Sequence, residues 1–298
     1  MNLLYLVLLC MMPATLCVAT PTAAFTRVTL APSILALGES SAARVQSVTA
    51  VWANPAGLHL GSKNTETSLS GAHIYQTQYT QFSIRHMIWG WGFGYGLRYA
   101  DFGEVPEIRW STLASSKILT PTGTQLTYQA YAHTLGISKK LRSHLSVGSR
   151  WTYIYERASH VKATGASLDV GVVVAPTRTW RIAVYTINIL NQAMTWTTPT
   201  QRQDKLPHYT TLGGYWELKP IDVSLSLDAT VTPQRDMYIK VGLQHDLTSQ
   251  LCWRLGVNQT ALHAGIGLRI SNAQLNVAWV HQPQQRFSNR FQWGVSYG

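Results

Sequence analysis

The stretch Ile221–Val231, IDVSLSLDATV, alternates apolar and polar side chains along its whole length. Its odd-numbered positions are apolar, and the even-numbered positions between them carry Asp, Ser or Thr. Because successive side chains of a β-strand point to opposite faces, this pattern predicts a strand with one apolar and one polar face. The same period recurs in 236–246, 250–258 and 261–271, so a series of such strands is predicted.

Period-two patterning continues through the chain from about Glu66 and defines fourteen candidate strands. They are predicted at 65–75, 77–87, 90–101, 125–138, 144–157, 163–176, 179–190, 208–218, 221–231, 236–246, 250–258, 261–271, 273–281 and 287–297. Strands of about ten residues span a bilayer when tilted, and single-chain bacterial barrels have an even number of them. The predicted fold is therefore all-β: a transmembrane antiparallel β-barrel of about 14 strands.

Composition agrees with a surface that is largely out of water. Only 12% of the 298 residues are charged and 46% are apolar, whereas soluble domains carry about 25% charged residues. The net charge is +11, but the densest basic cluster is only Lys139–Arg142. Scattered positive charge favours an anionic lipid surface, and nucleic acid is not expected as a partner.

Aromatic residues and turn lengths add to the barrel interpretation. Trp and Tyr recur near predicted strand ends, as at a membrane interface, although β propensity alone also enriches them. Turns expected at 102–124, 157–162 and 191–207 are long, and those between them are short. Outer-membrane barrels have long external loops and short periplasmic turns, which matches this alternation. In the last strand, Phe291, Trp293, Val295 and Tyr297 are expected to point outward.

The N-terminus is typical of a targeting sequence. Residues 1–24 are predicted to be a cleaved signal peptide with an apolar core at Leu3–Met12, and cleavage is expected after Ala19 or Ala24. Cys252 is then the one cysteine of the mature chain, so no intramolecular disulfide is expected. The barrel is assigned to residues 63–298.

Residues 25–62 lack strand periodicity and end in a compact turn, VWANPAGL at 51–58. Pro55 biases Asn54 toward extended geometry, and the Asn54 side chain can bond to the nearby backbone. Gly57 permits a positive φ. Small residues and tight turns suit a segment that folds into a barrel mouth; the alternative is a simple leader before the first strand.

The segment ALG…AA…AVWANPAGL resembles the N-terminal signature of the PorV/PorQ family within the FadL-like outer-membrane β-barrels. The matching residues are Ala36, Leu37, Gly38, Ala42, Ala43, Trp52, Asn54, Pro55, Ala56, Gly57 and Leu58. The resemblance implies a fourteen-stranded barrel in which residues 25–62 form a hatch. It implies passive transport of hydrophobic small molecules or, as in PorV-type members, a cargo-holding role in type IX secretion. Outer-membrane lipid is the expected surroundings of such a barrel. The Gly and terminal aromatic residues of the last strand are of the kind that the barrel-assembly machinery recognises, so this machinery is an expected partner.

Charged residues on the polar strand faces are candidates for lining the lumen. They are Arg150, Asp169, Asp228, Lys240, Arg254 and Arg269; the alternative is that they pair with one another across a narrow interior. No G-x-S-x-G, H-E-x-x-H or Walker motif is present. We therefore expect no catalytic residues, metal site or cofactor, and a non-enzymatic protein. A barrel-embedded hydrolase and a soluble periplasmic β-protein stay as alternatives.

Overall fold

The computed structural model describes residues 23–44, 47–61, 63–113, 116–177, 179–234, 236–283 and 289–298. The predicted signal peptide therefore lies outside the described residues, apart from Ala23 and Ala24. Within those ranges, no helix is both long and apolar enough to cross a membrane.

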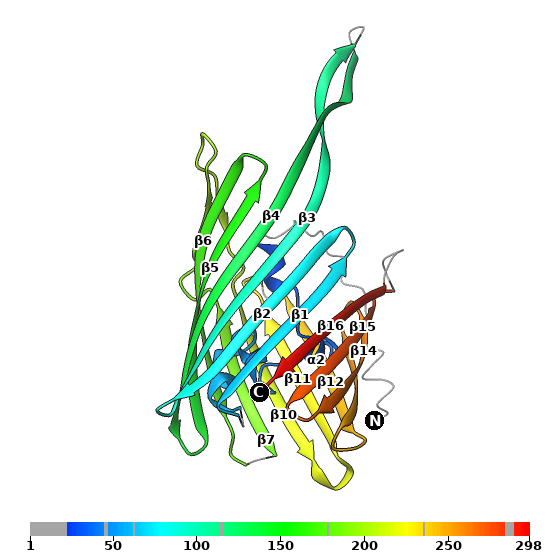
Figure 1. Cartoon of the computed structure of the whole chain (residues 1–298). Helices are drawn as coiled ribbons and strands as arrows, with labels where there is room; N and C mark the ends of the chain where they lie inside the picture. Colours follow the sequence, from blue (N-terminus) through cyan, green and yellow to red (C-terminus); the bar gives the residue numbers. More distant parts are fainter. Residues whose placement is uncertain are drawn as a thin grey trace.

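Fourteen antiparallel strands form a closed barrel (Figure 1), which confirms the predicted fold class. The strands are β1 (Thr65–Ile74), β2 (Thr77–Ile88), β3 (Trp91–Leu113), β4 (Ser116–Arg142), β5 (Leu145–Ala158), β6 (Val161–Val174), β7 (Trp180–Ile187), β10 (Tyr209–Leu218), β11 (Val223–Val231), β12 (Met237–Asp246), β13 (Leu251–Asn258), β14 (Leu262–Ile270), β15 (Ala273–His281) and β16 (Asn289–Tyr297). Neighbours in sequence pair with each other, and β1 pairs with β16 to close the sheet. Closure leaves the barrel without an unpaired edge.

Three connections differ from expectation. The expected loop 102–124 is instead mostly strand, because β3 and β4 continue as a paired hairpin beyond register shifts at Asp101/Glu104 and Pro106/Ile108. This hairpin extends beyond the rest of the barrel, at the end opposite the one where the C-terminus lies (Figure 1). The expected long turn at 157–162 is only the turn at Ser159–His160. The loop 191–207 holds a small hairpin, β8 (Ala193–Trp196) and β9 (Gln203–Lys205), paired to β6.

The two faces of the wall have opposite chemistry, as strand β11 illustrates. Leu225 and Leu227 are exposed on the outer surface, whereas Ser224, Ser226 and Asp228 are buried inside. In β16, Phe291, Trp293, Val295 and Tyr297 are all exposed. Inside the barrel, polar side chains pair across strands, as in the 2.7 Å contact of the Thr134 and Thr152 hydroxyls. Apolar side chains thus cover the outside and polar ones the interior.

Residues 23–61, which we call the N-terminal segment, form short helical turns joined by irregular chain. These are η1 (Ala24–Arg27), α2 (Pro32–Leu35), η2 (Val48–Val51) and η3 (Pro55–His59). The turns contact inward-facing residues of the wall, α2 against β14 and β15 and η3 against β4, β5 and β6. Leu35, Ala36, Leu37, Ala56 and Leu58 of the segment are fully buried.

Candidate functional site in the lumen

The turn at 51–58 is built around Asn54. The Asn54 backbone is extended, Pro55 occupies the first turn of η3, and Asn54 Oδ1 accepts a 3.1 Å hydrogen bond from the Ala56 amide. Asn54 Nδ2 donates to the Ala42 carbonyl at 3.0 Å, which ties the turn to the small-residue stretch before it. Gly57 permits a positive φ but does not adopt one, because it lies within η3. The left-handed glycine of the segment is Gly38, with φ of 65°.

Eleven inward-facing glycines of the wall lie directly against the N-terminal segment. At each of them, an added β-carbon would come closer than 3.0 Å to an atom of the segment. They are Gly92, Gly94 and Gly136 at Leu58, Gly96 at Trp52, Gly148 at Pro55, Gly171 at Asn54, Gly213 at Ala42, Gly242 and Gly256 at Leu37, Gly265 at Ala36, and Gly294 at Pro32. At Gly92, Gly148, Gly242 and Gly256 the near atoms include backbone atoms of the segment, and at the other seven they belong to its side chains. Glycine permits such close approach, so the wall is shaped to the path of the segment.

Arginines of the wall bind backbone carbonyls of the segment. Carbonyls outside regular secondary structure need partners when they are buried. The donors and acceptors are Arg85 to Leu58 and Gly61, Arg98 to Phe25 and Thr26, Arg150 to Val51 and Ala53, and Arg290 to Thr29, with donor–acceptor distances of 2.5–3.1 Å. The Arg98 guanidinium also lies 4.3 Å from the centre of the Trp52 ring. Four of the basic residues that give the chain its net positive charge therefore lie inside the barrel and bind the segment.

Carboxylates of the wall bind backbone amides of the segment. Asp228 Oδ2 accepts hydrogen bonds from the Ser41 and Ala42 amides at 2.7 and 2.9 Å. Glu66 Oε2 accepts one from the Val48 amide at 2.7 Å. In one further contact the wall supplies the cation and the segment the carboxylate: Lys240 Nζ lies 3.6 Å from Glu39 Oε2. Charge-assisted hydrogen bonds of this kind are about twice as strong as neutral ones.

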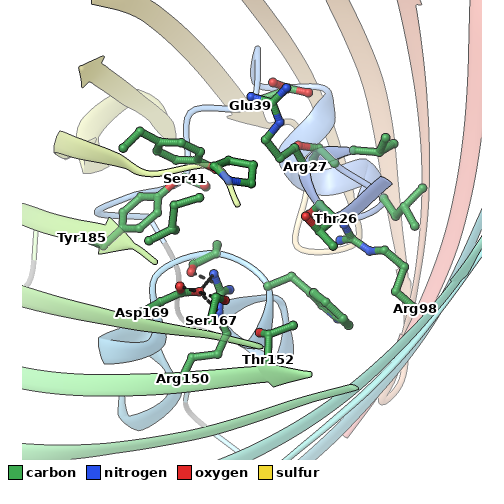
Figure 2. A pocket seen from close by; sticks show the side chains of 18 of the residues that line it. Thr26, Arg27, Glu39, Ser41, Arg98, Arg150, Thr152, Ser167, Asp169 and Tyr185 are labelled. Carbon is green, nitrogen blue, oxygen red and sulfur yellow. Dashed lines mark hydrogen bonds and ion pairs between the residues drawn. The ribbon is translucent and has the colours of Figure 1, made fainter. Parts of the chain in front are cut away.

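Arg150 and Asp169 form a buried ion pair on neighbouring strands (Figure 2). Their closest contact is 2.5 Å, and a second joins Arg150 Nε to Asp169 Oδ2 at 2.7 Å. Asp169 Oδ1 accepts a further 2.8 Å bond from the Asn188 amide. The pair therefore satisfies both charges while Arg150 still reaches the segment.

The six predicted lumen residues fall into two groups. Arg150, Asp228 and Lys240 contact the segment as described above, and Asp169 is grouped with them through its ion pair with Arg150. Arg254 donates to Gln244 and Asn276, and Arg269 is exposed and donates to the Ser249 carbonyl. Arg150 and Asp169 pair between the neighbouring strands β5 and β6 and not across the lumen, and Asp228 and Lys240 contact the segment.

Sequence reasoning missed Arg85, Arg98 and Arg290. Each occupies an inward position of its strand, as Arg98 does in the period-two series Gly92, Gly94, Gly96. The alternation in the sequence predicts that these arginine side chains face inward. It does not predict their carbonyl partners, because those lie 24 to 261 residues away in sequence.

Two cavities flank the segment. The first, of about 120 Å³, lies among Thr26–Ala31, Trp52, Arg98, Arg150 and Tyr185 (Figure 2). The second, of about 560 Å³, lies between residues 33–49 of the segment and strands β12–β16. Ile34 and Ser41 line both cavities, so this part of the segment separates them.

No family model matches the chain, and no curated protein matches it in sequence. Solved structures do match in fold. The toluene transporter TodX of Pseudomonas putida has a TM-score of 0.64 at 12% identity, over 89% of this chain and 96% of that one. The toluene transporter TbuX of Ralstonia pickettii has 0.59 at 14% identity, over 89% and 96%. A FadL homologue of Pseudomonas aeruginosa has 0.58 at 12% identity, over 91% and 98%. The chain thus has the fold of FadL- and TodX-type outer-membrane barrels.

Proposed function

We propose that the protein is a non-enzymatic outer-membrane channel for passive transport of hydrophobic small molecules, in which the N-terminal segment is the hatch. The observation that carries this proposal is the fit of the segment to the wall. Eleven wall glycines and four wall arginines contact it around the lumen. The solved structures of similar fold include two toluene transporters, which supports hydrophobic molecules as the substrate class.

The outer surface supports a membrane location. Exposed Leu, Val, Phe and Trp side chains alternate with buried polar ones along the strands, as lipid-facing strands require. Lipid of the outer membrane is therefore the proposed partner of this face, and the cleaved signal peptide and barrel-assembly machinery are the proposed route to it. The β3–β4 hairpin would then project to the outside of the cell.

The proposed pathway crosses the separation between the two cavities. A ligand reaching the cavity of about 120 Å³ would meet Ile34 and Ser41 before the larger cavity beyond them. An engineered apolar cavity of about 150 Å³ holds one benzene, so the smaller cavity has room for no more than one small ring in the closed state. Displacement of residues 34–41 would join the cavities into a continuous path.

The test compares uptake of labelled toluene and of a labelled long-chain fatty acid into liposomes that hold the refolded full-length protein. The variant Gly256→Ala introduces a β-carbon 2.0 Å from the Gly38 nitrogen, which should displace the segment and raise the uptake rate. The matched control is Gly71→Ala on the outer face, where the nearest atoms belong to the Trp293 ring at 3.0 Å. We expect uptake by the native protein, faster uptake by Gly256→Ala and no change in Gly71→Ala.

The secretion scaffold of PorV type remains the second hypothesis. The three solved structures named above give it no support, because their descriptions concern transport or a FadL homologue. If neither probe entered the liposomes through native protein or Gly256→Ala, with the barrel shown to be folded by heat-modifiable gel migration, transport would be rejected. A scaffold role would then be the better account.

A further inference from the structure

The larger cavity is unusually basic. It opens at the end of the barrel that holds the β14–β15 turn and Gly298, and four cationic side chains line it: Arg44, Lys63, Arg254 and Arg269. The acidic residue of its lining is Glu66, which already binds Arg85 at 3.4 Å and the Val48 amide at 2.7 Å. Lys63 Nζ donates to a Gly298 oxygen in the same lining. The positive charges that the lining does not balance are therefore those of Arg44, Arg254 and Arg269.

Arg44 of the segment and Arg254 of the wall converge on one neutral acceptor. Arg44 Nη2 and Arg254 Nε both donate to Gln244 Oε1, each at 2.7 Å. Their other hydrogen-bond acceptors are also neutral: Ser224 Oγ for Arg44 at 2.7 Å and Asn276 Oδ1 for Arg254 at 2.9 Å. Among the described residues, no carboxylate lies within 4.0 Å of Arg44, Arg254 or Arg269.

Asp246 is connected to Arg44 and Arg254 only through the side-chain amide of Gln244. Asp246 accepts a 2.7 Å hydrogen bond from Gln244 Nε2 and so faces away from the shared oxygen. Burial lowers the pKa of Arg44, and Tyr215, Asp246 and Glu217 oppose that shift. Arg150 offers a contrast inside the same barrel, because its guanidinium binds a carboxylate directly. Buried charges without such a partner are costly.

The Arg254 guanidinium lies against the backbone of Gly267. A β-carbon at Gly267 would lie 2.9 Å from both Arg254 Nη1 and Nη2. The glycine at this position therefore leaves the room that the guanidinium occupies. A guanidinium has five N–H donors in a planar fork that matches carboxylate and phosphate oxygens. Arg44 and Arg254 each make two hydrogen bonds, which do not use all five donors.

We propose that Arg44, Arg254 and Arg269 form a binding site for a small oxyanion, a carboxylate or a phosphate, in this cavity. The anion would bridge the N-terminal segment, through Arg44, to the wall, through Arg254. It would therefore stabilise the docked position of residues 42–44. The site follows from the charges and geometry of the cavity and does not depend on which molecule the barrel transports.

The experiment measures binding of inorganic phosphate and of acetate to the refolded full-length protein, by calorimetry and by the shift of the thermal unfolding midpoint. Chloride at equal ionic strength is the salt control. We expect saturable binding tighter than about 1 mM and a midpoint that rises with anion concentration. Arg254→Gln and Arg269→Gln should each weaken the affinity at least tenfold, and Arg254→Lys should recover part of it. Arg202→Gln, at an exposed site on the β8–β9 hairpin loop, should have no effect.

The outcomes separate clearly. Equal binding by native protein and Arg269→Gln, or no saturable binding of either anion, would overturn the proposal. Arg269 is exposed, so this variant should fold even if Arg254→Gln does not. Repeating the measurement in bilayers with and without phosphatidylglycerol identifies the source. Loss of free-phosphate binding only when the anionic lipid is present would identify a lipid headgroup as the competing occupant of the same site.

Discussion

Gly38 of the N-terminal segment and Gly256 of strand β13 lie in direct backbone contact. A β-carbon on Gly256 would be 2.0 Å from the Gly38 nitrogen, and one on Gly38 would be 2.7 Å from the backbone of neighbouring Val257. Two glycines are needed here because neither chain can move away without losing its other contacts. Asp228 holds Ser41 and Ala42 on one side, and the β12–β13 pairing holds the wall.

Gly38→Ala should destabilise the protein more than Gly90→Ala. Both residues have positive φ, at 65° and 76°, so each alanine carries a left-handed strain of about 1–2 kcal/mol. Gly90 has open space around it, whereas Gly38 faces backbone atoms of Val241 and Val257. Denaturant unfolding of both refolded variants measures the difference. Equal losses would mean that the segment is not held against β12 and β13.

Removing one partner of the Arg150–Asp169 pair should be costly. Arg150→Gln leaves a buried carboxylate without its cation, with an expected loss of about 3–5 kcal/mol. In the double variant Arg150→Gln/Asp169→Asn, the loss should be smaller than the sum of the two single losses. The free energy of unfolding across this double-mutant cycle gives the coupling.

The exposed pair Arg202–Asp204 provides the comparison for that cycle. Its contact distance is 2.9 Å, but the Arg202 side chain is 71% exposed, so the coupling should stay below about 1 kcal/mol. If the two cycles gave equal coupling energies, burial would not be what strengthens the Arg150–Asp169 pair.

The ion pair between Glu39 and Lys240 should survive mild acid. Burial alone would raise the pKa of Glu39, but Lys240, His263 and Arg290 outweigh it and hold the pKa below the ordinary value of 4.5. Because the folded-state pKa is depressed, its contribution is present above the ordinary value and is lost as the pH falls through the folded one. The Tm difference between native protein and Glu39→Gln should stay constant from neutral pH to about 4.5 and shrink below it. A difference that vanished near neutral pH would contradict the assignment.

Of the two predicted cleavage positions, the one after Ala19 fits the structure better. Ala23 is 2% exposed and packs with Phe25 and Leu30. Its carbonyl accepts hydrogen bonds from the Thr26 amide and hydroxyl at 2.9 and 2.7 Å. Cleavage after Ala24 would remove these contacts, so we expect the mature chain to begin at Thr20. Mass spectrometry of the N-terminal peptide from outer-membrane fractions tests this, and a mature N-terminus at Phe25 would refute it.

The strands were the most predictable part of the molecule. The fourteen predicted segments correspond to the fourteen barrel strands, with most ends within a few residues. The largest error lay at 102–124, which was expected to be a long turn. Gly103, Pro106, Pro121 and Gly123 lie in it, and these residue types favour turns. Pairing between β3 and β4 resumes beyond each irregularity, so a long-range partner overrode local preference.

The sequence alone determined which residues of each strand face inward, because a strand has a fixed side-chain period of two and one face must meet lipid. It therefore placed Asp228, Lys240 and Arg254 on the inner wall without knowledge of neighbouring strands. Only the tertiary structure decided what each inward charge binds. Asp228 holds two amides of the segment, and Arg150 holds two of its carbonyls as well as Asp169. The contacts with the segment join residues 97 to 187 positions apart, and no local pattern encodes where a distant backbone will pass.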